Sequence, residues 1–243
     1  GGRSVTTKLT HIWVYLAASP LLWLTVTLIA YQAANWVSRR FNFHPLANPV
    51  ALAVTALVIL LNLTGTPYTT YFDGAQFVHF LLGPATVALA IPLYLHFDRV
   101  KKMALPLLAA LVIGSTTAIL SAYWIARLLG GTREVALSLA PKSATMPIAM
   151  GITEKIGGLP SLTAVFVVLT GILGAVVGKL LLNKVRCRDY SIKGFAIGLT
   201  SHGIGTARAF QISELAGAFS GLAMGLNGLM TALLVPLMMR WMG

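Results

Sequence analysis

The chain has 243 residues, of which 57% are hydrophobic and only 10% are charged, and its formal net charge is +12. Soluble domains carry about a quarter charged residues, so this composition excludes a soluble globular protein and predicts an integral membrane protein. The basic residues lie in short loops between apolar runs, which fits positive-inside topology better than a nucleic-acid footprint. We therefore expect a lipid bilayer around the chain and no nucleic-acid partner.

The length predicts one integral membrane domain over residues 1–243, an all-α polytopic protein with about seven to eight transmembrane segments of about 20 residues each. The segments expected from hydropathy, in chain order, are 12–36, 46–63, 79–97, 103–129, 133–157, 159–182, 194–213 and 215–242. Proline and glycine interrupt 79–97, 133–157 and 194–213, which we predict to form a broken-helix transport core. The spans within 12–63 and 103–129 are expected to be its scaffold.

The stretch 140–147, Ala-Pro-Lys-Ser-Ala-Thr-Met-Pro, places a lysine between two prolines inside an apolar region. Each proline opposes a continuous helix, and unpaired backbone at membrane depth is tolerated only where it lines a protein-walled cavity. We predict that Ser143 or Thr145 caps a new helix with Pro147 in its first turn. The amide groups of that turn and the Lys142 ammonium would form a site for an anion.

A second polar stretch, Ser-His-Gly-Ile-Gly-Thr-Ala-Arg, occupies residues 201–208. His202 has two interpretations: a group that titrates near neutral pH and couples a proton to transport, or a packed membrane histidine. Its glycines indicate a turn or close backbone approach. Arg208 either belongs to the site or pairs structurally with Glu214.

Lys142, His202 and Arg208 are expected at membrane depth, whereas the acidic residues fall in loops or at segment ends. A charge inside the membrane costs at least about 2.5–3.5 kcal/mol, so it normally has a partner or a function. Because these groups are cationic and, apart from Glu214 near a helix end, no acid is obviously available to neutralise them, a small organic anion would do so. In the alternative interpretation, Lys142 reaches the interface from a shallow hairpin.

The predicted substrate-binding residues are Lys142, Ser143, Thr145, His202, Gly205, Thr206 and Arg208, and the predicted lining of the helix breaks is Pro84, Thr86, Pro141 and Pro147. The sequence has no nucleotide-binding glycine loop, zinc-ligand spacing or Ser/His/Asp arrangement. We therefore expect no enzyme activity, no cofactor and no metal.

Positive loops at 39–40, 99–102 and 184–193 predict three cytoplasmic loops, with the loop 64–76 on the opposite side. Because the second and third of these loops lie on the same side, the chain must cross the membrane an even number of times between them. Two long spans supply those crossings, so 133–157 is expected to be a re-entrant hairpin or a pair of half-helices. Interrupted segments of this kind are typical of transporters with inverted repeats, although the sequence repetition here is thin.

Glycines lie at four-residue spacing in two late spans, at Gly174 and Gly178 and at Gly217, Gly221 and Gly225. Small residues at this spacing allow helices to approach closely. We expect these faces to pack helices together and to support a homodimer, in which an elevator-like core moves against its scaffold.

Four collinear motifs resemble the LrgB/CidB family: Leu-Gly-Pro-Ala-Thr at 82–86, the stretch at 140–147, Gly-Ile-Leu-Gly-Ala at 171–175, and Ser-His-Gly-Ile-Gly-Thr-Ala-Arg-Ala at 201–209. The resemblance covers nearly the whole chain. The family pattern is Pro-Lys-Ser-Val-Thr-Thr-Pro, where this chain has Ala144 and Met146. The missing hydroxyl at 146 weakens a substrate role for that position.

The LrgB/CidB family includes bacterial proteins described as holin-like or antiholin-like regulators of murein hydrolase activity and cell lysis. It also includes the plant plastid glycolate/glycerate translocator, and some bacterial members are linked to transport of pyruvate and related acids. The resemblance implies a multi-pass bacterial inner membrane protein that carries glycolate, glycerate, lactate or pyruvate, beside a small holin-like membrane partner. The alternative it implies is an antiholin-like regulator of lysis.

Overall fold

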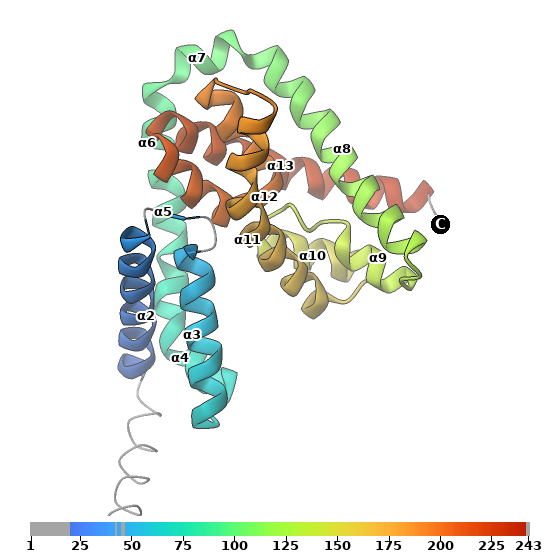
Figure 1. The fold of residues 1–243 in the computed structure, drawn as a ribbon. Coiled ribbons are helices and arrows are strands. Elements are labelled where there is room, and N and C mark those ends of the chain that lie inside the picture. The colour runs from blue at the N-terminus through green and yellow to red at the C-terminus, as the bar shows by residue number, and fades with distance from the viewer. Residues whose placement is uncertain (1–19, 42, 45–46, 242–243) are drawn as a thin grey trace, which may run out of the picture. The chain divides into compact units, whose positions relative to one another are not determined.

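The computed structural model describes residues 20–41, 43–44 and 47–241, and over these residues the protein is built of α-helices without a strand (Figure 1). This confirms the predicted all-α membrane fold. The chain divides after Ala88 into two compact units, 1–88 and 89–243.

The first unit contains α2 (Pro20–Arg40), α3 (Pro49–Thr64), α4 (Tyr68–Phe80) and α5 (Leu82–Ala88). Residues 12–19 of the predicted first span lie outside the described residues. The side chain of Asn48 accepts hydrogen bonds from the amides of Val50 and Ala51 and so starts α3, and Gly65 ends it with φ 63°.

The prediction of a loop over 64–76 was wrong, because α4 begins at Tyr68. Two contacts with α2 explain why this segment is helical. The Trp23 and Tyr71 rings pack edge to face with centroids 5.8 Å apart, and Gly74 lies so close to the Pro20 carbonyl that a Cβ there would overlap it. Aromatic packing, and the close approach of the two helices at Gly74, which has no side chain, therefore hold α4 against α2.

The second unit contains α6 (Ala90–Leu95), α7 (Phe97–Lys102), α8 (Ala104–Leu128), α9 (Arg133–Leu139), α10 (Met146–Ile156), α11 (Pro160–Lys184), α12 (Tyr190–Ile212) and α13 (Glu214–Trp241). One buried cluster of its core joins α8 to α12 and α13 through Leu111, Leu199 and Phe219. Another joins α8, α9, α10 and α13 through residues such as Ile119, Leu137 and Val235.

The interrupted segment 79–97 is broken at Leu81, Leu89 and His96 rather than at its prolines. Pro84 is the third residue of α5, and Pro92 is the third residue of α6. Proline has no amide hydrogen, and in the first turn of a helix that hydrogen has no partner to lose. Each proline therefore starts a new helix just after a break.

Four described stretches are long and apolar enough to cross a membrane: Tyr68–Leu95, Ala104–Leu128, Pro160–Lys184 and Glu214–Arg240. The helix Pro49–Thr64 is shorter but also apolar. The predicted total of seven to eight segments stays a prediction.

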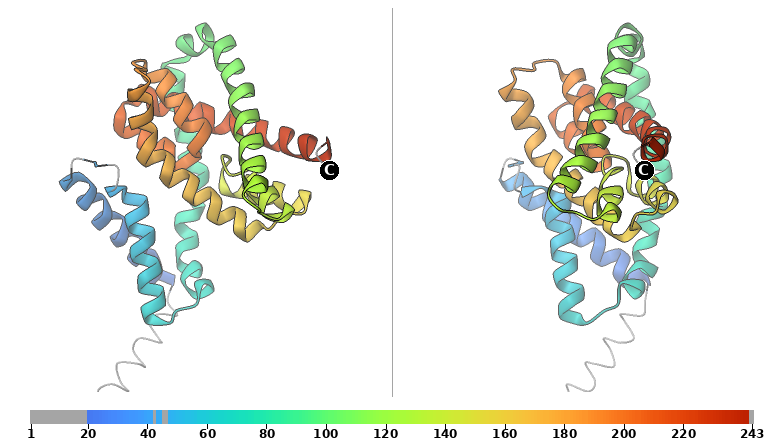
Figure 2. Two further views of the ribbon diagram at one scale, coloured as in Figure 1. Left: turned by 45° about the vertical axis from the view of Figure 1, so that its right-hand side comes forward. Right: turned by 90° about the vertical axis from the view of Figure 1, so that its right-hand side faces the viewer.

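In the second unit, the order of a long helix followed by an interrupted segment occurs twice. The 25-residue helix α8 precedes α9 and α10, and the 25-residue helix α11 precedes α12. The helices α8 and α11 run in opposite directions (Figure 2). This arrangement matches the plan of an inverted repeat.

The helix α12 is interrupted at His202, whose backbone has the non-helical values φ 41° and ψ −135°. Before this point, α12 packs closely on α13: a Cβ at Gly194 would overlap the carbonyl of Ala216, and one at Gly198 would overlap the carbonyl of Ser220. In these two contact pairs the residue numbers rise together along α12 and α13, so the first half of α12 runs parallel to α13.

After His202 the direction is reversed. The Thr206 hydroxyl lies 2.9 Å from that of Ser220, and the Phe210 ring covers Gly217. In these pairs the residue number falls along α13 as it rises along α12, so the second half of α12 runs antiparallel to α13. A straight helix cannot be both parallel and antiparallel to one neighbour. α12 is therefore a re-entrant hairpin of two half-helices, which confirms that 194–213 is an interrupted segment.

An ion pair joins two of the loops that charge counting assigns to the cytoplasm. The Arg99 guanidinium lies 2.7 Å from the carboxylate of Asp189, and Asp189 also accepts hydrogen bonds from the amides of Ser191 and Ile192 as the N-cap of α12. Desolvation is the largest single effect and raises the pKa of Asp189, but these hydrogen bonds and the Arg99 charge together outweigh it and lower that pKa. The contact supports placing both loops on one side of the membrane.

Candidate functional site: two broken hairpins that meet at Lys142

The helix in segment 133–157 is broken from Ala140 to Thr145, as its prolines predict. α9 ends at Leu139 and α10 starts at Met146, with Pro147 in the first turn. Thr145 has the N-cap backbone conformation, but its side chain makes no capping hydrogen bond. The predicted side-chain cap at Thr145 is therefore absent, and the first amides of α10 are left to other acceptors.

Neighbouring helices satisfy the backbone carbonyls that this break frees. The Thr163 hydroxyl donates to the Ser138 carbonyl at 2.9 Å, and the Asn227 amide donates to the Ser143 carbonyl at 3.0 Å. Asn227 is itself fixed by the Ser115 hydroxyl, which donates to its side-chain oxygen at 2.7 Å. Polar side chains of α8, α11 and α13 thus support irregular backbone at membrane depth.

Lys142 lies in the middle of this break and is half-buried. Its ammonium is 3.5 Å from the hydroxyl of Ser143, which is buried. Among the described residues, no carboxylate lies within ion-pair distance of Lys142. The ammonium of Lys142 therefore keeps donor capacity for an anion.

The second interruption places His202 at the tip of the α12 hairpin, buried to 5% exposure. Its Nε2 atom lies 2.9 Å from the Val167 carbonyl of α11. A Cβ at Gly171 would come within 2.7 Å of the imidazole, and a Cβ at Gly174 would overlap the hydroxyl of Ser201. Glycines of α11 therefore create the space that this tip occupies.

Val167 brings the two tips together. Its side chain packs with Ala144 of the first break, and its carbonyl lies within hydrogen-bond distance of His202 of the second. The two hairpins enter from opposite ends of the unit and meet beside one turn of α11.

The other predicted site residues of α12 have structural contacts. Gly205 gives room for Ser201 and Ile197 at the reversal. The Thr206 hydroxyl donates to the His202 carbonyl at 2.8 Å, and the Arg208 guanidinium donates to Gln211 at 2.7 Å. Binding roles for these residues stay predictions.

Two predicted lining residues belong to the other unit. Pro84 and Thr86 lie in α5, and the side chain of Thr86 is outside the described part of the structure. Their assignment to the site also stays a prediction.

Sequence reasoning missed the polar residues that hold the hairpins. Ser115, Thr163 and Asn227 are buried within long apolar helices. A buried polar side chain needs a hydrogen-bond partner, so a polar residue inside an apolar span was the available sequence signal that this position binds another part of the chain.

The predicted glycine faces pack within the chain. A Cβ at Gly174 would overlap Ser201, one at Gly178 would lie 3.5 Å from Ile197, and one at Gly221 would lie 3.7 Å from Leu89, whereas one at Gly225 would have no neighbour within 4 Å. This agrees with the predicted close packing, and the homodimer stays a prediction.

Comparison with known proteins gives a consistent result along the chain. The LrgB-like family matches residues 27–241. The uncharacterised protein YwbG of Bacillus subtilis (strain 168) is 38% identical over 219 residues, which cover 90% of this chain and 97% of that protein. The antiholin-like protein LrgB of Bacillus mycoides (strain KBAB4) is 30% identical over 225 residues, or 93% of this chain and 98% of that protein.

A protein of Haemophilus influenzae (strain ATCC 51907 / DSM 11121 / KW20 / Rd) is 33% identical over 219 residues, which cover 90% of this chain and 94% of that protein. No solved structure matches the chain. The apolar helices and these bacterial relatives together indicate a bacterial membrane protein. The chain belongs to the LrgB-like family.

Proposed function

We propose that this protein is an inner-membrane carrier for small organic monocarboxylates of the glycolate, glycerate, lactate or pyruvate type. The observation that carries this proposal is the meeting of two oppositely directed broken hairpins beside Lys142, which has no carboxylate in ion-pair distance among the described residues. An anion there neutralises the ammonium and accepts hydrogen bonds from the first turn of α10.

The same arrangement supports alternating access. Each hairpin enters from one side, so withdrawing one tip opens the site to that side while the other tip stays closed. Lys142, Ser143 and Thr145 would hold the carboxylate, with His202, Gly205 and Thr206 on the facing hairpin and Arg208 farther along it. We propose no catalytic role for any of these residues.

Uptake of labelled glycolate by proteoliposomes tests the carrier. We expect saturable uptake that lactate competes for, and a 10- to 100-fold loss in Lys142→Gln, because a charge-assisted hydrogen bond contributes about 1.5–3 kcal/mol. Lys142→Arg restores the charge and should recover part of the uptake. Lys184→Gln, at the exposed end of α11, is the matched control and should transport normally.

A second candidate function is an antiholin-like regulator of cell lysis, which the name of the Bacillus mycoides relative favours. It predicts altered autolysis on expression, to the same degree with and without Lys142. It also predicts no competition between acids in vesicles. Unselective leakage of a dye of similar size to glycolate would count against the carrier.

A further inference from the structure

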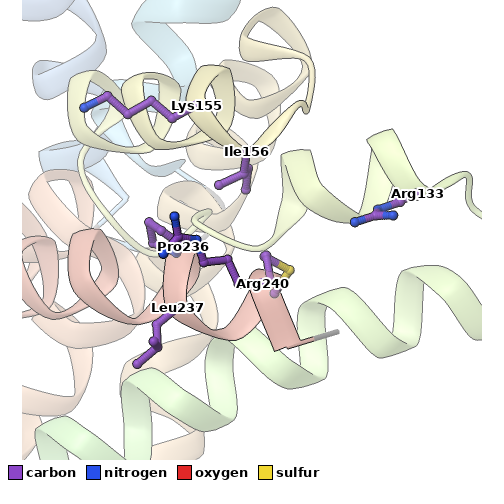
Figure 3. Close-up of a pocket in the computed structure, with 7 residues that line it drawn as sticks. Arg133, Lys155, Ile156, Pro236, Leu237 and Arg240 are labelled. Atoms are coloured by element: carbon purple, nitrogen blue, oxygen red, sulfur yellow. The ribbon is translucent and has the colours of Figure 1, made fainter. Parts of the chain in front are cut away.

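The tips of the two hairpins are buried where they meet. Ala144 and Ser143 of the first break are 1% and 6% exposed, and His202 of the second is also buried. A pocket of about 560 Å³ in the second unit lies elsewhere, at the start of α9 and the ends of α10 and α13 (Figure 3). Its lining, which includes Arg133 and Arg240, contains none of these tip residues. The buried side of the meeting point is therefore reached only when one tip moves.

His202 holds the α12 tip against α11 by a side-chain hydrogen bond. Because a carbonyl oxygen only accepts, the Nε2 atom of His202 carries a hydrogen and donates it to the Val167 carbonyl at 2.9 Å. The imidazole lies in a notch at Gly171, where a Cβ would come within 2.7 Å of it. The Thr206 hydroxyl bonds to Ser220 of α13 and so does not hold the tip on α11. The contact with α11 therefore needs a donor on residue 202 and no side chain on residue 171.

The backbone of His202 opposes this contact. Its φ of 41° and ψ of −135° lie in a region that glycine adopts easily and other residues do not, so release of the imidazole would let the backbone relax. The cost of such a backbone and the net gain from one neutral hydrogen bond are of similar size. The held and the released tip are therefore close in free energy, which is the property of a switch.

The α9–α10 hairpin is held more firmly. Asn227 of α13 donates to the Ser143 carbonyl at 3.0 Å, and Thr163 of α11 donates to the Ser138 carbonyl at 2.9 Å. These bonds satisfy carbonyls that the break frees, so breaking them would leave backbone groups unpaired at membrane depth. The tip of α12 is thus the one that moves at lower cost.

We propose that His202 and the notch at Gly171 form a strained latch that closes the carrier site to the cytoplasm. The α12 hairpin enters from the side of the Arg99–Asp189 ion pair, which positive-inside topology makes cytoplasmic. Withdrawal of the imidazole from the Val167 carbonyl would free the tip and open the site on that side. This inference rests on the proposed carrier function, for which it names the gate.

The test measures access to Ala144, which packs against Val167 at the meeting point, in the full-length chain. Ala144→Cys in a Cys187→Ser background is labelled with a membrane-impermeant maleimide in inside-out and in right-side-out membrane vesicles. The latch variant adds Gly171→Ala, whose methyl group meets only the ends of side chains, so it displaces the imidazole without unfolding the protein. The matched control adds Gly225→Ala, where the same methyl group has no neighbour within 4 Å.

We expect Gly171→Ala to raise the labelling rate from the cytoplasmic side roughly two- to tenfold, the factor that one neutral hydrogen bond contributes. The rate from the outer side should not change. His202→Ala, which removes the donor, should act in the same way. His202→Gln, which restores a donor, and Gly225→Ala should both label at the parental rate.

An equal rise with Gly225→Ala, or any rise from the outer side, would overturn the latch, because it would show a general loosening of the helices. No rise with Gly171→Ala would overturn it as well. Labelling needs no substrate, so its outcome is distinct from that of glycolate uptake. Uptake without selective labelling refutes the latch alone, whereas absence of uptake refutes the carrier.

Discussion

His202 is the residue whose backbone conformation departs furthest from that of its own helix. Its φ of 41° with ψ of −135° belongs to a region that glycine occupies easily and other residues do not. The Val167 carbonyl and the space above Gly171 hold the imidazole in place. Backbone strain at the meeting point of two hairpins is a feature of functional sites.

A pair of substitutions isolates this strain. His202→Gly and His202→Ala both remove the imidazole, but only alanine keeps the unfavourable backbone. We expect the alanine variant to be less stable by about 1–3 kcal/mol in denaturant unfolding. Within an ordinary helix the order is opposite, and alanine is more stable than glycine by about 1 kcal/mol. Finding that ordinary order would show that α12 is continuous at this position.

Lys142 and its surroundings show how far single residues could be predicted. Two prolines around a lysine were enough to locate the break, because their effect is local and backbone-based. The side chains that support that break, those of Thr163 and Asn227, lie 25 and 84 residues after the carbonyls they bind. Only the folded arrangement of the helices identifies such pairs.

At the scale of elements, Asn227 connects three of them. Its amide donates to the Ser143 carbonyl and its oxygen accepts from Ser115, so it joins α13 to the first break and to α8. Asn227→Ala leaves the carbonyl and the Ser115 hydroxyl without these partners, which costs about 1–3 kcal/mol.

A double-mutant cycle measures this connection. We expect Asn227→Ala/Ser115→Ala to be less destabilised than the sum of its single variants, since both substitutions remove one shared bond. Asn227→Ala should also reduce glycolate uptake, because the break that carries Lys142 loses its support. Asn62→Ala, which removes an exposed bond within α3, should change stability by less than about 0.5 kcal/mol. Strict additivity would argue against the connection.

Asp189 fixes the start of α12 in a pH-dependent way. Desolvation raises its pKa in the folded protein, but the amides of Ser191 and Ile192 and the charge of Arg99 together outweigh desolvation, so the pKa is lowered. The carboxylate therefore stabilises the fold at pH values above its unfolded pKa, and that contribution is lost as the pH falls through the lowered folded pKa. Asp189→Ala should remove it and cost about 1 kcal/mol at neutral pH.

The control for this prediction is Asp189→Asn, which keeps the cap and removes the charge. It should be nearly as stable as the wild type at neutral pH, because asparagine caps as well as aspartate and an exposed ion pair contributes little. Unfolding measured from pH 7 to pH 3 should give a steeper loss for the wild type than for the Asn variant. Parallel curves would contradict the role of Asp189.

Elements were predicted unevenly from the sequence. Apolar runs identified α8, α11 and α13 because length and hydropathy suffice for a membrane span. The loop prediction over 64–76 was wrong because α4 depends on contacts with α2 rather than on its own hydropathy. The reversal of α12 was visible only as an interruption, since its direction depends on packing against α13.

At the scale of the whole molecule, the reversal of α12 sets the side on which α13 ends. With one re-entrant hairpin before α13, Arg240 lies on the side opposite Cys187; with a continuous α12 the two would lie on the same side. Cys187 is the single cysteine of the chain, so it is a natural probe of this difference.

Labelling of intact cells with a membrane-impermeant maleimide tests on which side of the membrane each position lies. We expect Cys187 to react only after permeabilisation. In a Cys187→Ser background, Glu134→Cys and Arg240→Cys should both react in intact cells. Reaction of Glu134→Cys but not of Arg240→Cys would show that α12 crosses the membrane.

The opposed entry of the α9–α10 hairpin and the α12 hairpin has a consequence for transport. In the proposed carrier, the two hairpins would act as gates that face opposite compartments. Such a carrier would have no intrinsic direction, so the concentration gradients of the acid would decide between import and export.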